Sequence, residues 1–189
     1  MTGWHIHTGP VAVLPHENVD TDQLIPARFM SAARSAGYGQ FLLHDHPDRA
    51  RIAGAEILIA GRNFGSGSSR EAAVYALVDA GIRAVIAPGF GDIFAANAVN
   101  NGLLPATVTP EDAAALMRHS GPLTVDLVAQ TVNGTPFTLP ETWRQKLLNG
   151  WDDIDLTASH TAEIKAFSTT YHGKNPWSLP NPKGDNPCE

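Results

Sequence analysis

The segment that decides the fold runs from Ala55 to Glu71 and has the sequence AEILIAGRNFGSGSSRE. Its first six residues are a short apolar run that ends at Gly61, as expected of a buried β-strand. A loop rich in glycine and serine follows. The residues from Glu71 to Ala80 then favour a helix, and Gly81 is suited to end it. A buried strand, a loop and a helix in this order predict a parallel β/α unit.

The alternation of strand and helix continues downstream. Further elements are expected as strands over Ala84–Ala87 and Leu103–Val108, a helix over Asp92–Asn101, and a helix with Thr109 as N-cap and Pro110 in its first turn. Repeated parallel β/α units predict an α/β fold with helices packed on a sheet. This core is expected to lie in one domain, residues 1–174, followed by a proline-rich extended tail over residues 175–189.

Four other elements are expected around this core. They are a short strand over Gly9–Leu14, a hairpin that joins residues 123–132 to 135–139 through Asn133-Gly134, and helices over Trp143–Leu148 and Thr161–Ser168.

Composition excludes several classes of protein. The 189 residues carry a net charge of −6 and no basic run, which argues against binding to nucleic acid. No stretch has the roughly 20 apolar residues that span a bilayer, and the N-terminus has no signal-peptide pattern, so a cytoplasmic location is expected. Cys188 is the single cysteine, and one thiol cannot form an internal disulfide or hold an iron–sulfur cluster by itself.

The loop Gly65–Glu71 is suited to an anion. It precedes a helix, where unpaired backbone N–H groups favour negative charge, and Arg70 adds a guanidinium that fits a carboxylate or a phosphate. The common nucleotide and hydrolase motifs fail here: the P-loop lysine is absent, and Arg70 and Glu71 stand where a dinucleotide fingerprint and a nucleophile elbow need glycine. Ser68 and Glu71 also fit a helix capping box, an alternative that needs no ligand.

The loop resembles the Gly-x-Gly-Ser-Ser-Arg-Glu signature of the swivelling domain in the aconitase superfamily. Three other blocks, Asn18–Pro26, Ala84–Phe94 and Asn149–Thr157, resemble the isopropylmalate dehydratase small subunits of that superfamily. The resemblance covers roughly Thr8 to Phe167 in one order, so a chance match at a single motif does not explain it.

This resemblance implies a swivelling β/β/α domain, as in the aconitase C-terminal domain, that docks on a large subunit carrying a [4Fe-4S] cluster. The pair, a heterodimer or heterotetramer, would isomerise 2-isopropylmalate to 3-isopropylmalate by dehydration and rehydration, a hydro-lyase step of leucine biosynthesis. The substrate is a small 2-hydroxy diacid. This chain would bind no cofactor or metal of its own and would be active only with its partner.

The resemblance also assigns roles to individual residues. Ser68 matches the catalytic base, and Asp22 matches an acidic residue near the active site. Substrate contacts are implied for Gly67, Ser69 and Arg70, and are also expected of Arg28 and Arg34.

The chain departs from the family pattern in ways that leave alternatives open. Ala72 stands where a histidine is common, and Arg34 lies one residue earlier than the family's loop arginine relative to the following glycines. A paralogous hydro-lyase for another alkylmalate or a methylmalate, and a non-catalytic anion-binding module, therefore remain alternatives. The pairs His5-x-His7 and His44-x-His46 lack an evident third ligand, so no metal site is predicted.

Overall fold

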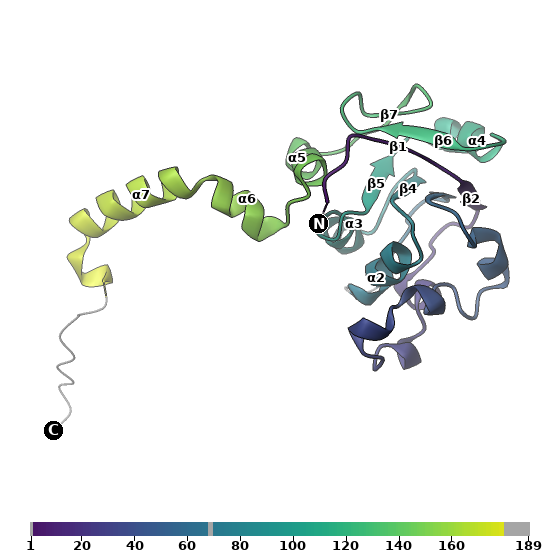
Figure 1. The fold of residues 1–189 in the computed structure, drawn as a ribbon, viewed down its shortest axis with the longest axis horizontal. Helices are drawn as coiled ribbons and strands as arrows, with labels where there is room; N and C mark the ends of the chain where they lie inside the picture. The colour runs from purple at the N-terminus through teal and green to yellow at the C-terminus, as the bar shows by residue number, and fades with distance from the viewer. Residues whose placement is uncertain (1, 68–69, 180–189) are drawn as a thin grey trace. The chain divides into compact units, whose positions relative to one another are not determined.

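A computed structural model of the chain describes residues 2–67 and 70–179 (Figure 1). These residues divide into two compact units, Met1–Asp153 and Ile154–Glu189. The first unit contains two four-stranded sheets, one parallel and one antiparallel. Among the described helices, none is long and apolar enough to cross a membrane.

The parallel sheet forms the centre of the first unit. Its strands are β2 (Val11–Leu14), β3 (Ile57–Ala60), β4 (Ala84–Ala87) and β5 (Leu104–Thr107), hydrogen-bonded in that order. Every residue of β3 and β4 is buried, because both faces of the sheet are covered. The predicted parallel β/α core is therefore confirmed.

Alternate residues of the parallel strands face two separate hydrophobic clusters. Leu58 and Val85 pack with α2 (Ala72–Asp79) on one face. Ile57 and Ile86 pack on the other face with α4 (Pro110–Met117) and the antiparallel sheet. Helix α3 (Asp92–Asn100) contributes residues to both clusters. The strand period of two residues thus distributes one apolar run between two cores.

The antiparallel sheet consists of β1 (Ile6–Gly9), β6 (Leu123–Asp126), β7 (Thr131–Val132) and β8 (Thr135–Pro136). Asn133 and Gly134 turn from β7 to β8 with φ of 47° and 84°, as a type I′ hairpin requires. The prediction of one long arm over residues 123–132 was wrong, since β6 and β7 pair with each other.

The predicted single strand over Gly9–Leu14 was also wrong. Its residues belong to β1 and β2, which lie in different sheets. Pro10 separates them: proline has no N–H to donate to a ladder, and its carbonyl oxygen accepts from the N–H groups of Glu56 and Ile57 instead.

The segment between β2 and β3 is built from short helical turns. Helix α1 (Thr21–Leu24) begins with a capping box between Asp20 and Gln23, and four 3₁₀ turns follow: η1 (Ala27–Phe29), η2 (Arg34–Ala36), η3 (Gly39–Phe41) and η4 (Pro47–Ile52). Leu24, Ile25, Leu42 and Leu43 are buried in the cluster that also contains α2, so this polar segment is firmly packed.

The C-terminal part is helical. It comprises α5 (Glu141–Asn149), α6 (Asp153–Ser159), α7 (Thr161–Lys174) and the turn η5 (Pro176–Ser178). Helix α7 continues six residues beyond the expected Ser168. The expected single domain over residues 1–174 stays a prediction. Residues 180–189 of the expected tail lie outside the described residues, so its extended form stays a prediction.

A buried lysine ties α5 to the elements around it. Lys146 is 3% exposed, and its Nζ donates to Asp153 Oδ1 at 2.6 Å and to Asn100 Oδ1. Asn100 Nδ2 in turn donates to Asp153 Oδ2 at 2.9 Å. The hydrogen bonds from Lys146 and then from Asn100 lower the pKa of Asp153 below its ordinary value of 3.8.

Replacing Asp153 with asparagine should lower the free energy of unfolding by about 1–3 kcal/mol at neutral pH, because the buried ammonium loses its charged partner. A lowered folded-state pKa stabilises the protein above the unfolded-state pKa, and this stabilisation is lost as the pH falls through the folded-state value. The difference between wild type and Asp153→Asn, measured by thermal denaturation, should therefore shrink below pH 3.8. A difference that stays constant into that range would contradict the ion pair.

Candidate active site

Three sequence blocks meet where the parallel strands β2, β3 and β4 end. Gly65 N–H donates to the carbonyl oxygen of Val19 at 2.7 Å, and Thr21 N–H donates to that of Ser66 at 3.1 Å. The segment after β4 is held in the same way. Phe64 N–H donates to the carbonyl oxygen of Gly89 at 3.0 Å, and Gly91 N–H donates to that of Phe64 at 2.9 Å. The glycine–serine loop is thus held by backbone hydrogen bonds between the segments that follow β2 and β4. Ligands of parallel α/β sheets commonly bind at this carboxyl edge.

Gly65 is required by the packing of this edge. Its φ is +73°, and a Cβ built on it would lie 2.2 Å from Cγ of Phe94. The ring of Phe94 fills this space from α3 and also contacts the ring of Phe64 at a centroid distance of 5.4 Å. The loop can follow this path only because residue 65 has no side chain.

The substitution Gly65→Ala should lower the free energy of unfolding by about 2–5 kcal/mol, the sum of a left-handed backbone penalty and overpacking against Phe94. Gly89→Ala is the matched control, since nothing lies within 4 Å of a Cβ at that position. Urea denaturation of both variants checks the prediction. Equally small losses for both variants would show that Phe94 does not restrict the loop.

Arg70 and Asp22 are brought together at this edge. The Arg70 guanidinium forms an ion pair with the carboxylate of Asp22, which lies on α1. The Arg70 side chain is 34% exposed and that of Asp22 is 56% exposed, and Nη1 of Arg70 is buried where it faces Asp22. Gly67, also predicted for the site, is exposed with φ of +92°. Ser68 and Ser69 lie outside the described residues, so their predicted roles stay predictions.

Two cavities open beside these residues, and each is large enough for a small diacid. The first has a volume of about 340 Å³ and is lined by Gly65, Ser66, Gly67, Gly91, Asp92, Ile93 and Phe94. The second has a volume of about 460 Å³ and is lined by Asp20, Asp22, Gln23, Asp45, His46 and Pro47. The first cavity is thus lined by the glycine–serine loop, and the second by the carboxylates of Asp20, Asp22 and Asp45.

The sequence is similar to those of known proteins. Residues 43–111 match the family description of the aconitase C-terminal domain. The 3-isopropylmalate dehydratase small subunit of Shewanella baltica is 43% identical over 88% of this chain and 96% of its own length. That of Halalkalibacterium halodurans is 42% identical over 87% and 96%. The chain belongs to the family of 3-isopropylmalate dehydratase small subunits. The expected family and its swivelling α/β fold are confirmed.

A solved structure supports the same fold. The crystal structure of 3-isopropylmalate dehydratase from Methanocaldococcus jannaschii superposes with a TM-score of 0.68 at 25% identity, covering 85% of this chain and 99% of that one.

Helix α2 of this small-subunit family member begins at Ala72, with Glu71 in the preceding position. The Glu71 side chain accepts a hydrogen bond from Asn101 Nδ2 at 2.9 Å. Burial and a hydrogen bond to Glu71 raise the pKa of Tyr75. Glu71 therefore anchors the end of the signature loop to neighbouring elements. The capping-box interpretation rests on Ser68, outside the described residues, and stays a prediction.

Arg34 is engaged by a carboxylate of its own chain. Its guanidinium binds both oxygens of Asp79 at the end of α2, with Nη2 2.9 Å from Oδ1, and lies 4.4 Å from the centroid of the Tyr75 ring. Asp79 also accepts from the backbone N–H of Tyr38 at 2.7 Å. These contacts hold the loop around Arg34, the residue that lies one position earlier than the loop arginine common in the family. Asp79 could not be found from sequence, because it is 45 residues away.

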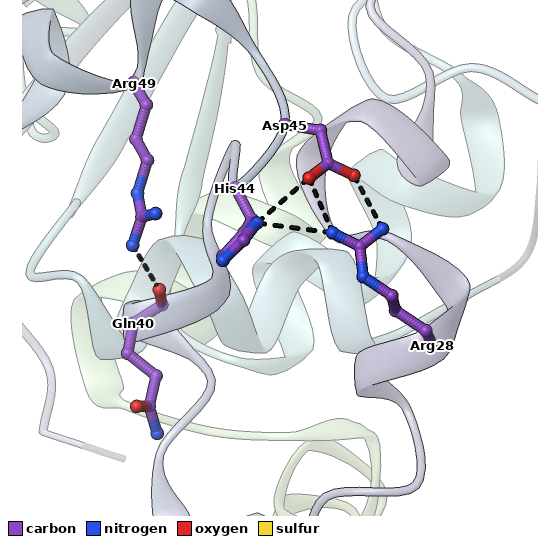
Figure 2. A network of polar contacts seen from close by, with 5 residues as sticks. All are labelled: Arg28, Gln40, His44, Asp45 and Arg49. Carbon is purple, nitrogen blue, oxygen red and sulfur yellow. Dashed lines mark hydrogen bonds and ion pairs between the residues drawn. The ribbon is translucent and has the colours of Figure 1, made fainter.

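Arg28 has an equivalent partner in Asp45 (Figure 2). Its Nη1 donates to Asp45 Oδ2 at 2.7 Å and its Nη2 to Oδ1 at 2.5 Å, while His44 Nδ1 lies 2.9 Å from Oδ1. The hydrogen bonds from Arg28 and then from His44 hold the pKa of Asp45 well below its usual range. Arg49 beside them donates to the carbonyl oxygen of Gln40 at 2.6 Å. Substrate contacts of Arg28 and Arg34 stay predictions.

Proposed function

We propose that this chain is the small subunit of a hydro-lyase that isomerises 2-isopropylmalate to 3-isopropylmalate by dehydration and rehydration, a step of leucine biosynthesis. The observation that carries the proposal is the meeting of three sequence blocks around Phe64–Ser66 at the carboxyl edge of the parallel sheet, together with the ion pair between Arg70 and Asp22. The names of relatives more than 40% identical over most of the chain support the same reaction.

The chemistry explains the need for these groups. The proton to be removed lies α to a carboxylate and is weakly acidic, so negative charge accumulates on that carboxylate as the proton leaves. Donors fixed where the charge develops stabilise it. The guanidinium of Arg70 is suited to this task, and Asp22 holds it through its ion pair. Gly67 and Ser69 are proposed to contact the same anion.

Ser68 is proposed as the base. A serine hydroxyl is a weak base in water, so it can act only where its alkoxide is favoured over the alcohol. The N-terminus of α2 and the positive charge of Arg70, two residues away in sequence, shift the equilibrium in that direction. Asp22 is proposed to orient Arg70 in this arrangement, which is its part in catalysis.

The hydroxide that leaves the substrate needs a Lewis acid. A [4Fe-4S] cluster held by a large partner subunit would supply this Lewis acidity. The single cysteine of this chain, Cys188, cannot hold a cluster by itself and lies outside the described residues. We therefore propose that this chain binds no cofactor and completes a site shared with a large iron–sulfur subunit.

Reconstitution tests this division of labour. The full chain and its large subunit, purified separately under anaerobic conditions with iron and sulfide, should each lack hydro-lyase activity, and mixing them should produce it. Absorbance of the unsaturated diacid follows the dehydration step. A cluster bound to this chain alone, with turnover, would contradict the two-subunit assignment.

A second candidate substrate is favoured by the engagement of Arg34 with Asp79. A loop arginine held in this way changes the environment of the substrate's variable side chain, so another alkylmalate or a methylmalate is the alternative. A panel of 2-alkylmalates tested with the same reconstituted complex separates the two. The highest kcat/KM for 2-isopropylmalate supports the first candidate, and a higher value for another member supports the second.

A further inference from the structure

Three metal-ligating side chains gather at the edge of the second cavity. His16 follows β2, whereas His46 and Asp48 flank the start of η4. Each offers one ligand atom, and these atoms lie within 4.8 Å of one another. Among residues 2–67 and 70–179, this is the one group of three or more such side chains with that spacing. His46 is thus joined by His16, from a distant part of the sequence, and by Asp48, whereas His44 is not part of the group.

The contacts within the cluster show where the ligand atoms point. His16 Nε2 lies 2.6 Å from Asp48 Oδ2, and His46 Nδ1 lies 3.9 Å from the same oxygen. The two imidazole rings are 5.1 Å apart and tilted by 62°. His46 Nδ1 also accepts the backbone N–H of Asp48 at 3.1 Å, so this nitrogen is unprotonated and would exchange that hydrogen bond for a bond to a cation. Two imidazole nitrogens and one carboxylate oxygen therefore converge.

We propose that His16 Nε2, His46 Nδ1 and Asp48 Oδ2 form a binding site for a divalent transition-metal cation of the zinc class. Metal–ligand bonds of about 2.0–2.2 Å in a tetrahedral site place ligand atoms roughly 3.3–3.6 Å apart, so the cluster needs only a small rearrangement. The His16 side chain is 48% exposed and free to rotate by that amount. The N–H of Asp48 then bonds to water.

The surroundings favour this class of ion. A set of two imidazoles and one carboxylate suits Zn²⁺, Ni²⁺ or Co²⁺ better than Mg²⁺ or Ca²⁺, which prefer oxygen ligands. Arg51 Nε lies 3.0 Å from Asp48 Oδ1, which leaves Oδ2 for the cation and fixes the carboxylate from behind.

A bound cation would fasten two segments that are 32 residues apart in sequence. Its position lies beside the cavity that His46 shares with Asp20 and Asp22. Three protein ligands leave at least one coordination position for water or for an anion. The site is independent of the proposed hydro-lyase function, because none of its ligands is assigned a role in the reaction.

Metal titration of the full chain tests the proposal. The protein, stripped with a chelator, is titrated with Co²⁺ followed by absorption and with Zn²⁺ followed by calorimetry. One ion should bind per chain. The absorption spectrum of bound Co²⁺ should be that of nitrogen and oxygen ligands, without a thiolate charge-transfer band. Zn²⁺ should raise Tm. The substitutions His16→Gln, His46→Gln and Asp48→Asn should each weaken binding by about 100-fold or more.

Two matched controls should bind as tightly as wild type. His44→Gln removes a neighbouring imidazole that contacts Arg28 and Asp45 instead, and Cys188→Ser removes the single thiol. Tm of every metal-free variant shows whether it folds, and the half-exposed His16 provides the variant least able to disturb packing. No stoichiometric ion in the wild type, or wild-type affinity in all three ligand variants, would reduce the cluster to an ion pair between His16 and Asp48.

Discussion

Replacing Ser68 with glycine should reduce dehydration by the reconstituted complex by a factor on the order of 10²–10⁴, the range typical of a lost general base. Glycine keeps the backbone N–H groups of the loop and removes only the hydroxyl. Glycine in place of serine at a helix N-cap costs only about a few tenths of a kcal/mol, so Tm should stay near that of wild type. Steady-state kinetics, thermal denaturation and a binding assay with the large subunit measure the three quantities.

Two serine variants serve as comparisons for Ser68→Gly. Ser69→Gly should be milder, because Ser69 is proposed to contact the substrate rather than to move a proton. Ser120→Gly changes an exposed serine outside the helices and strands and should leave the rate unchanged. A Ser68→Gly complex that keeps most of the wild-type rate would place the base in the partner subunit.

Replacing Arg70 with glutamine should lower kcat/KM by a factor on the order of 10²–10³, the loss expected when one donor to a developing oxyanion is removed. Arg70→Lys should fall between this variant and wild type, because lysine keeps the charge but not the planar pair of donors. Both variants should fold, since Asp22 is 56% exposed and can be hydrated when its partner is gone. Kinetics over a range of 2-isopropylmalate concentrations measure the effect.

Arg62→Gln is the matched control for Arg70. Arg62 lies at the start of the same loop, but its side chain is 66% exposed and 3.8 Å from Glu17, a weak surface ion pair. This variant should keep wild-type kcat/KM and Tm. If Arg70→Gln lowered Tm but left kcat/KM unchanged, the ion pair with Asp22 would be a structural clamp and the substrate carboxylate would bind elsewhere.

Several local elements of this protein could be predicted from the sequence. The apolar run Ala84–Ala87 forms β4 with the bounds that were predicted. Thr109 caps α4, because its Oγ1 accepts a hydrogen bond from Asp112 N–H at 3.1 Å. Asn133 and Gly134 form the expected turn. These features depend on residues close together in the chain, whose burial period, missing N–H groups and backbone freedom act within a few positions. The family could likewise be inferred from the signature loop Gly65–Glu71, because the residues of this motif are adjacent in the chain.

The contacts between side chains far apart in sequence could be identified only from the tertiary structure. Pro10 divides one apolar run between two sheets, and Arg34 and Arg28 are engaged by Asp79 and Asp45. His46 lies with His16 rather than with its neighbour in the His44-x-His46 pattern. Such contacts join residues far apart in sequence, and they depend on how strands order in the sheet and which rotamers the packed core permits. No local pattern contains that information, because a side chain's partner is set by the packing of the whole domain.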